Sequence, residues 1–172
     1  MRPLLSAILI TCATLAQAAM SSFTFPSIDG GEIDLAAWRG QPVLVVNTAS
    51  RCGYTPQYDG LQELYDTYRD RGLVVLAIPS NDFRQELASD EEVKDFCEVN
   101  FGLDFPMTTI TSVRGDSAHP FYKWLETETG FAPSWNFNKV LIAPDGSVAA
   151  TFGSNARPMS RTVTDAITAL LD

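Results

Sequence analysis

The 172-residue chain is acidic and mixed in composition, and these two properties exclude several classes of protein. It carries 12 Lys and Arg residues against 21 Asp and Glu residues, which gives a formal net charge of −9. A chain of this charge is repelled by nucleic acid and by anionic membrane surfaces, and no basic cluster offsets the repulsion. With 45% hydrophobic residues, the chain is long enough to bury the core of one compact domain.

The N-terminal segment, residues 1–19, has the three parts of a secretory signal peptide. Arg2 gives a positively charged start, residues 4–15 are largely apolar, and residues 16–18 (AQA) form a small-x-small cleavage site. The apolar stretch is too short to span a membrane comfortably. We therefore expect residues 1–19 to be removed and the protein to be exported, either to a periplasm or as a secreted protein.

The remaining residues, 20–172, are expected to form one domain that does not insert into a membrane. Loss of Arg2 takes the formal net charge from −9 to −10. The alternative to a cleaved secretory signal is a lipoprotein signal that acylates Cys12. The residue before Cys12 is Thr, which is larger than such a site usually accepts, so the secretory signal is favoured.

Short apolar runs bounded by turn residues predict the strands of this domain. They lie at residues 23–25, 33–35, 43–46, 73–78, 139–143 and 148–152. Turns that contain Gly and Asp join the first two strands into one hairpin and the last two into another. The run at 43–46 (VLVV) is apolar and mostly β-branched, which is typical of a buried strand.

Helical spacing and capping residues predict the helices. They run from Pro56 to about Arg71, from a capping box at residues 89–92 (SDEE) to Gly102, through Phe121 and Trp124, and onward from Ser160. Thr55 is expected to be the N-cap of the first helix, because Thr suits that position and Pro suits the next one. Strands that alternate with helices and end in a hairpin and a helix predict a layered α/β domain.

Cys52 is the most informative residue of the chain. It follows the strand at 43–46 and precedes the helix that begins at Pro56, in a stretch of polar and Gly residues that indicates an exposed loop. The positive end of a helix dipole favours a thiolate over a thiol. Cys52 is therefore a candidate nucleophile, and a buried structural cysteine is the alternative. By analogy of fold, a reactive Cys at such a junction suggests a thioredoxin-like domain with a central mixed sheet flanked by helices.

The chemistry of Cys52 depends on its neighbours. It is not part of a C-x-x-C pair, because position 55 is Thr, and a lone thiolate fits attack on a peroxide O–O bond with formation of a sulfenic acid. Such a site needs N–H donors that do not titrate. The candidates are Asn81, Gln85, Trp135 and Asn136. Composition alone favours a structural role for each of them, Trp135 as a core residue and the amides as turn residues.

Three separated motifs change this balance. They are residues 47–55 (NTASRCGYT), residues 79–86 (PSNDFRQE) and residues 135–139 (WNFNK), and they occur in this order. From about Ser22 to the C-terminus the chain resembles the cysteine-containing branch of the glutathione peroxidase family. The segments at residues 105–107 (FPM) and 119–120 (HP) are also similar to family segments.

The resemblance implies which residues form the site. The peroxidatic residue of the family falls on Cys52, and the Gln, Trp and Asn that complete the family's site fall on Gln85, Trp135 and Asn136. The middle motif departs from the family: it is one residue short, Ser80 stands where many members have Cys, and Leu87 replaces a common Pro. Asn81 is therefore kept as an alternative to Gln85 for the amide donor.

Cys97 has two interpretations. Its position on one helical face with Val93 and Phe96 is typical of a core cysteine. In thioredoxin-dependent members of the resembled family the resolving cysteine falls in the corresponding helix, so the resemblance implies a Cys52–Cys97 disulfide during turnover. That disulfide would require the helix to unwind locally.

The remaining candidates are weaker. His119 is the single histidine, lies between Ala118 and Pro120, and is interpreted as a capping or packing residue rather than a catalytic base. With one His and two Cys after loss of the signal, a zinc site is not expected, and no other cofactor is expected.

The sequence thus predicts an exported thiol-dependent peroxidase that reduces hydrogen peroxide and organic hydroperoxides. Its expected reductant is a thioredoxin-like protein or a low-molecular-weight thiol. A monomer is favoured, because the stretch between Trp124 and Trp135 lacks the added loop of oligomeric family members. The alternatives are a redox-relay protein that passes a Cys52–Cys97 disulfide to a client, and a binding domain that holds a permanent disulfide.

Overall fold

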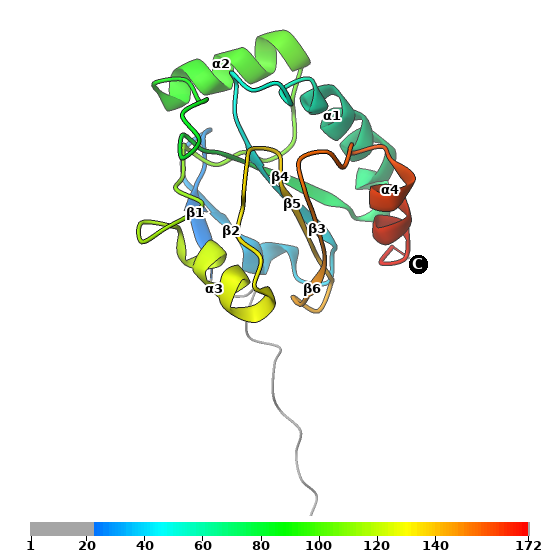
Figure 1. Cartoon of the computed structure of the whole chain (residues 1–172). Helices are drawn as coiled ribbons and strands as arrows, with labels where there is room; N and C mark the ends of the chain where they lie inside the picture. Colours follow the sequence, from blue (N-terminus) through cyan, green and yellow to red (C-terminus); the bar gives the residue numbers. More distant parts are fainter. Residues whose placement is uncertain (1–22, 172) are drawn as a thin grey trace, which may run out of the picture.

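A mixed sheet of four strands lies at the centre of the computed structural model, which describes residues 23–171 (Figure 1). The strands are β3 (Val43–Thr48), β4 (Val74–Pro79), β5 (Lys139–Ile142) and β6 (Val148–Phe152), in the order β4-β3-β5-β6. Strand β3 pairs parallel with β4 and antiparallel with β5, and β5 pairs antiparallel with β6. The mixed α/β sheet predicted from the sequence is therefore confirmed.

The predicted signal peptide, residues 1–19, and the alternative acylation site Cys12 lie outside the described residues. Between residues 23 and 171, no helix has the length and apolar character that crossing a membrane requires.

The two central strands are buried at every position because layers cover both faces of the sheet. Side chains alternate between the faces, so Leu44 and Val46 enter one hydrophobic cluster while Val43 and Val45 enter the other. The continuous apolar run of β3 is thus explained by burial on both sides.

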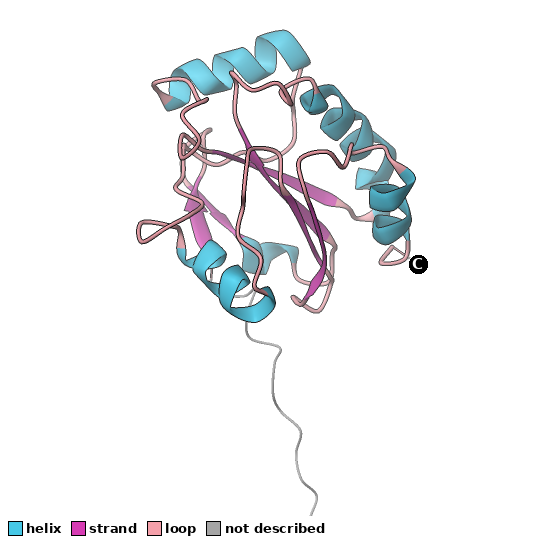
Figure 2. Cartoon of the chain, in the orientation of Figure 1, coloured by secondary structure: helices cyan, strands magenta, loops and turns pink. Residues whose placement is uncertain are grey.

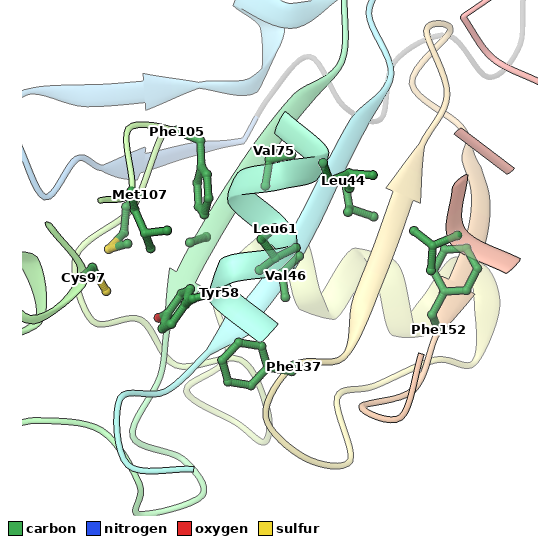
Figure 3. Packing of buried hydrophobic residues seen from close by; sticks show 14 of the residues in the cluster. Leu44, Val46, Tyr58, Leu61, Val75, Cys97, Phe105, Met107, Phe137 and Phe152 are labelled. Carbon is green, nitrogen blue, oxygen red and sulfur yellow. The ribbon is translucent and has the colours of Figure 1, made fainter. Parts of the chain in front are cut away.

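Helices α1 (Gln57–Tyr68), α2 (Asp90–Phe101) and α4 (Arg161–Thr168) supply the cluster on one face. Its buried members include Leu64, Val163 and Ile167. Tyr58, Leu61 and Cys97, which belong to the same cluster, are labelled in Figure 3. The apolar residues of each helix recur at helical spacing, which is why one stripe of each helix faces the sheet.

The other face is covered by helix α3 (Pro120–Thr129), the hairpin of β1 (Thr24–Pro26) and β2 (Glu32–Asp34), and the 3-10 helix at Leu35–Trp38 (Figure 2). His119 is the N-cap of α3: its Nδ1 accepts the Phe121 N–H at 3.2 Å, and its ring stacks on Phe25. The capping and packing role predicted for His119 is confirmed, and burial lowers the pKa of its imidazole.

Helix α2 begins and ends where the sequence predicts. The Ser89 hydroxyl accepts the Glu92 N–H at 3.2 Å, and Gly102 ends the helix with a φ of +59°, a backbone conformation that favours Gly. Only Val93 and Cys97 of this helix are buried. Helix α2 therefore covers its face of the sheet with few anchoring side chains.

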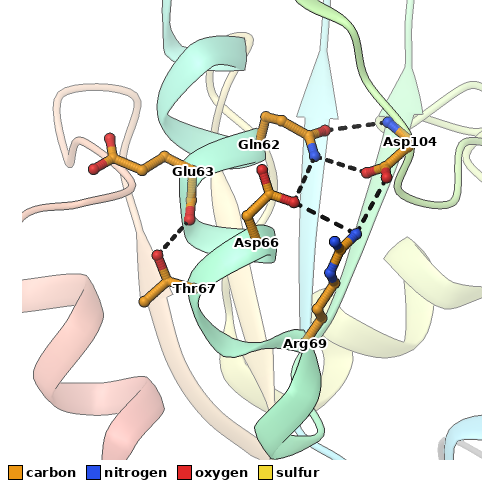
Figure 4. Close-up of polar contacts among 6 residues, drawn as sticks. All are labelled: Gln62, Glu63, Asp66, Thr67, Arg69 and Asp104. Atoms are coloured by element: carbon orange, nitrogen blue, oxygen red, sulfur yellow. Dashed lines mark hydrogen bonds and ion pairs between the residues drawn. The ribbon is translucent and has the colours of Figure 1, made fainter.

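A polar network fixes the segment that follows α2 to helix α1 (Figure 4). Gln62 Nε2 donates to Asp104 Oδ1 at 2.7 Å, the Asp104 N–H donates back to Gln62 Oε1 at 3.1 Å, and Arg69 pairs with Asp104 Oδ2 at 3.2 Å. These groups are exposed, so each contributes little to the free energy of folding. Together they hold the chain in place just beyond the Gly102 end of α2.

The prediction that Thr55 is the N-cap of α1 is wrong. Pro56 occupies the cap position and makes no side-chain hydrogen bond to the helix. The Thr55 side chain instead turns back toward Cys52, which a prediction based on local propensity alone could not anticipate.

Two serines occupy N-cap positions but differ in their contacts, which gives a test of cap energetics. Ser89→Ala removes a hydrogen bond to the helix and should lower the free energy of unfolding by about 1 kcal/mol. Ser160 makes no side-chain cap bond, since its hydroxyl donates to Arg157 O at 2.7 Å. Ser160→Ala should therefore cost less, and equal losses in urea unfolding would contradict the assignment.

Candidate active site

Cys52 lies in a tight turn between the end of β3 and the start of α1. The Thr55 hydroxyl closes this turn, because it donates to Ala49 O at 2.8 Å and accepts the Cys52 N–H at 3.0 Å. The Thr55 N–H also donates to Cys52 O at 3.0 Å. Both backbone polar groups of Cys52 are therefore bonded within the turn, and the side chain is held in one place.

The Cys52 sulfur accepts a backbone N–H, that of Tyr54, at 3.4 Å. Such a donor favours the thiolate, since hydrogen bonds to the charged form stabilise it. The expectation of an exposed thiol is wrong, because Cys52 is only 8% exposed. The buried Ser50 and Thr55 side chains draw the turn inward, and Arg51 and Gly53 are the members of the turn that face outward.

The segment that carries Gln85 is docked on the Cys52 turn through backbone groups. Gln85 O accepts the Arg51 N–H at 2.8 Å. The next residue, Glu86, accepts the Ser50 N–H at 3.0 Å through Oε1, and burial raises the pKa of its carboxyl. Two consecutive residues of one loop thereby fix two consecutive residues of the other.

Asn136 joins this assembly from the turn before β5. It is fully buried, and its Nδ2 donates to Gln85 Oε1 at 2.9 Å. Its Oδ1 has no hydrogen-bond partner among the described residues, a property that it shares with other buried atoms such as Glu86 Oε2 and the Tyr122 hydroxyl.

Trp135 is not a core residue, because 41% of its surface is exposed and its ring lies against Phe83 with centroids 5.3 Å apart. The backbone of the turn is tied to β3 by a hydrogen bond from Asn47 Nδ2 to Trp135 O at 3.0 Å. The structure therefore places the Trp135–Asn136 turn beside the end of the strand that leads to Cys52.

Gln85 and Asn81, the two candidates for the amide donor, make different contacts. Gln85 meets Asn136, whereas Asn81 Oδ1 accepts the Glu86 N–H at 3.3 Å and so braces the loop. The chain turns sharply at Arg84, which has a φ of +57° that residues other than Gly rarely adopt. This turn directs the Gln85 side chain to Asn136 although the motif is short.

Cys97 lies on the inner face of α2, is 1% exposed, and is a free thiol like Cys52. Burial is the main cause that raises the pKa of the Cys97 thiol to about 12. The Tyr58 hydroxyl, which lies beside it in Figure 3, acts in the opposite direction, and the charge of Glu86 adds to the rise. Cys97 is therefore a neutral thiol at neutral pH and unreactive where it lies.

Lys139 was not identified from the sequence as a site residue. It is fully buried at the start of β5, and burial lowers the pKa of its amine to about 7. Its Nζ donates to Gln57 Oε1 and to Phe137 O, both at 2.8 Å. Its place in a strand suggested a packing or surface position, and only the tertiary contacts show that it touches both sides of the site.

A surface cavity of about 530 Å³ adjoins the Cys52 turn at Gly53 and Tyr54. The start of α1 and the segment at residues 155–159 form its other walls. Within residues 23–171, no group of three or more His, Cys, Asp or Glu side chains could hold a metal ion.

Comparison with known proteins gives one family. The sequence model of the family described as "Glutathione peroxidase" matches residues 20–126. A "Hydroperoxy fatty acid reductase" of Synechocystis is 41% identical over 147 residues, which cover 79% of this chain and 87% of that protein. A "Glutathione peroxidase-like peroxiredoxin" of Schizosaccharomyces pombe is 42% identical over 135 residues, which cover 76% and 85%.

Solved structures agree. The crystal structure of T. cruzi GPX1 has 31% identity and a TM-score of 0.71, and covers 89% of this chain and 96% of that one. A thioredoxin family protein from Chlorobium tepidum has 17% identity and a TM-score of 0.65 over 87% of this chain and 93% of that one. This second likeness concerns the fold alone, and the predicted thioredoxin-like fold is confirmed.

The Thr55 hydroxyl is the group whose removal should loosen the Cys52 turn most selectively. Thr55→Val keeps the side-chain shape but leaves Ala49 O and the Cys52 N–H without their partner, so the free energy of unfolding should fall by about 1–3 kcal/mol. Thr55→Ser keeps the hydroxyl and should lose less. Denaturant unfolding of the reduced proteins measures both, and equal stability of Thr55→Val and the parent would contradict the role of this hydroxyl.

Proposed function

Because the chain belongs to the glutathione peroxidase family, we propose that Cys52 is the thiol with which it attacks peroxides. The protein is a thiol-dependent peroxidase, as its family and relatives show. The observation that supports Cys52 most directly is the contact between Gln85 and Asn136 beside the Cys52 turn. Loops far apart in the sequence meet there at the turn that carries Cys52, whose sulfur accepts an N–H of its own turn.

In the first step the Cys52 thiolate attacks one peroxide oxygen. A sulfur–oxygen bond forms and the O–O bond breaks, so that sulfur is oxidised to a sulfenic acid and the peroxide is reduced to an alcohol or to water. The departing oxygen takes up the electron pair of the O–O bond and then a proton from solvent. Its developing negative charge is what N–H donors in the site would stabilise.

Three groups can supply those donors without titrating. The Tyr54 N–H already contacts the sulfur, the Asn136 amide is fully buried at Gln85, and Trp135 carries an indole N–H on an exposed ring. The buried Asn136 Oδ1, which lacks a partner among the described residues, offers an acceptor for the O–H of a hydroperoxide. We assign Gln85 to hold the Asn136 amide in place.

In the second step Cys97 condenses with the sulfenic acid. A sulfur–sulfur bond forms, the sulfur–oxygen bond of Cys52 breaks, and the hydroxide that leaves takes the Cys97 proton to become water. Cys97 points from α2 into the core of the protein, and the pKa of its thiol is raised. The helix must therefore open before this step, so that the thiol can reach Cys52.

Helix α2 is built so that its second half can open. Its first half is anchored by Asp90, which accepts the Ile110 N–H at 2.6 Å, and by Lys94, which pairs with Asp29 at 2.6 Å. Beyond Cys97 no side chain of α2 is fully buried: Phe101 is half-buried against Tyr58, with ring centroids 5.2 Å apart, and Gly102 ends the helix. Helical turns with few buried contacts have low local stability, which supports Cys97 as the resolving cysteine.

A thioredoxin-like dithiol protein would then reduce the disulfide and regenerate both thiols, with a low-molecular-weight thiol as the other candidate. Hydrogen peroxide and organic hydroperoxides are the proposed substrates. We further propose that residues 1–19 are a removed signal and that the protein acts as an exported monomer, in the periplasm or secreted. The family match begins at residue 20, and a mass of the mature protein that includes residues 1–19 would overturn this proposal.

Replacement of Cys52 tests the nucleophile. Cys52→Ser should abolish peroxide reduction and leave the fold intact, because Ser is close in size and the turn is held by Thr55 and backbone bonds. Stopped-flow consumption of hydrogen peroxide by the reduced protein measures this. A parent protein that reacts rapidly only with client disulfides would instead identify a redox relay.

Replacement of Cys97 tests the resolving step. Cys97→Ser should react once with peroxide and then stop, so that a dimedone-trappable sulfenic acid accumulates on Cys52. Turnover with a thioredoxin-like reductant should be lost. Normal repeated turnover of this variant would show that Cys97 is only a core residue.

A further inference from the structure

Lys139 closes a ring of hydrogen bonds around the candidate site. Its Nζ donates to Gln57 Oε1 at 2.8 Å, and Gln57 Nε2 donates to Ser154 O at 2.6 Å. The Ser154 hydroxyl donates to Asn136 O at 2.7 Å. From Asn136 the chain passes to Phe137, whose carbonyl accepts the second bond of Lys139 at 2.8 Å.

The ring joins two parts of the protein that meet at Cys52. Gln57 is the first residue of α1 and follows the Cys52 turn directly. Asn136 and Phe137 belong to the turn that brings Asn136 to Gln85. Lys139 is the side chain that contacts both parts at once.

The turn needs such support because its backbone is unfavourable. Phe137 has a φ of +61°, a left-handed conformation that is unfavourable for a residue with a side chain. This conformation persists only if surrounding bonds impose it. The Phe137 N–H donates to Asn47 O at 2.6 Å, and the bond from Lys139 fixes the carbonyl at the other end of the same residue.

Burial of the Lys139 amine costs free energy, because its charged form loses contact with water. Lys139 is fully buried, and burial alone accounts for the lowered pKa of its amine. The amine keeps two N–H donors after loss of its extra proton, so both bonds persist in either form. Because the Lys139 amine is buried despite this free-energy cost and bonds to residues beside the site, we infer a role beyond packing.

We propose that Lys139 is a positioning residue of the peroxidase site, which ties the start of α1 to the Trp135–Asn136 turn and thereby sets the place of the Asn136 amide relative to Cys52. The proposal rests on the proposed function, in which Asn136 stabilises the departing oxygen. Lys139 itself touches neither the sulfur nor the peroxide; it acts through Asn136.

The test is a double-mutant cycle between Lys139→Met and Asn136→Ala, with the rate of the first, peroxide-dependent step measured by stopped flow. Asn136→Ala should slow that step by about 10²–10³-fold, as expected for loss of a preorganised donor. Lys139→Met should slow it by at least about 10-fold and leave disulfide formation unchanged. Because both changes disable the same group, the double variant should be slowed far less than the product of the two single effects.

Lys123→Met is the matched control, since Lys123 is exposed on α3 and its loss should leave both steps at the parent rate. Gln57→Leu removes the two bonds that Gln57 makes in the ring, to Lys139 and to Ser154, while Lys139 keeps its bond to Phe137, and it should show the same non-multiplicative pattern with a smaller effect. This variant keeps the test decisive if Lys139→Met does not fold.

The outcomes separate the two proposals. If Asn136→Ala is slow but Lys139→Met and Gln57→Leu react at the parent rate, or if the effects multiply, the role of Lys139 is overturned. If Asn136→Ala and Cys52→Ser both react at the parent rate, the proposed site itself is wrong.

Discussion

The hydrogen bond between Asn136 and Gln85 is the interaction on which the site depends. It joins two loops that lie 51 residues apart in the sequence and that each dock separately on the strand and turn leading to Cys52. Neither loop could place an amide at the site alone, because each approaches from one side of β3. The central position of β3, with β4 on one edge and β5 on the other, is what makes both approaches possible.

Much of this fold could be predicted from the sequence, because local patterns and burial agree. The apolar run of β3 and the Ser89 and Gly102 signals of α2 gave elements close to those observed. Thr55 shows where local reasoning fails. Its hydroxyl could bond either to the start of the helix or to the turn. It bonds to the turn, because two buried backbone groups of the Cys52 turn would otherwise lack a partner.

For the proposed site as well, local patterns predict some features, and others depend on tertiary contacts. The motifs predict Cys52, Gln85, Trp135 and Asn136 as site residues because each stands in a recognisable order along the chain. The burial of Cys52 and the contact between Gln85 and Asn136 depend on how loops pack, and no periodicity encodes that. Lys139 could not be predicted as a site residue for a related reason, since a charged residue in a strand is expected at the surface. Its burial is explained by the two hydrogen bonds of its amine, which depend on the tertiary structure.

The roles proposed for the two thiols have opposite structural requirements: fixed surroundings for Cys52 and a mobile helix for Cys97. Attack on a peroxide benefits from donors that are fixed before the reaction. The Thr55 hydroxyl fixes the turn that carries Cys52, and the bond between Asn136 and Gln85 fixes the neighbouring amides. The proposed resolution requires a buried thiol to leave a helix, and Cys97 is the one fully buried side chain in the second half of α2. The bonds between Asp104 and α1 lie beyond Gly102, outside the segment that would open. In this proposal Cys97 leaves its helix while the hydrogen bonds around the Cys52 turn stay in place, so the amides proposed for the next peroxide keep their positions.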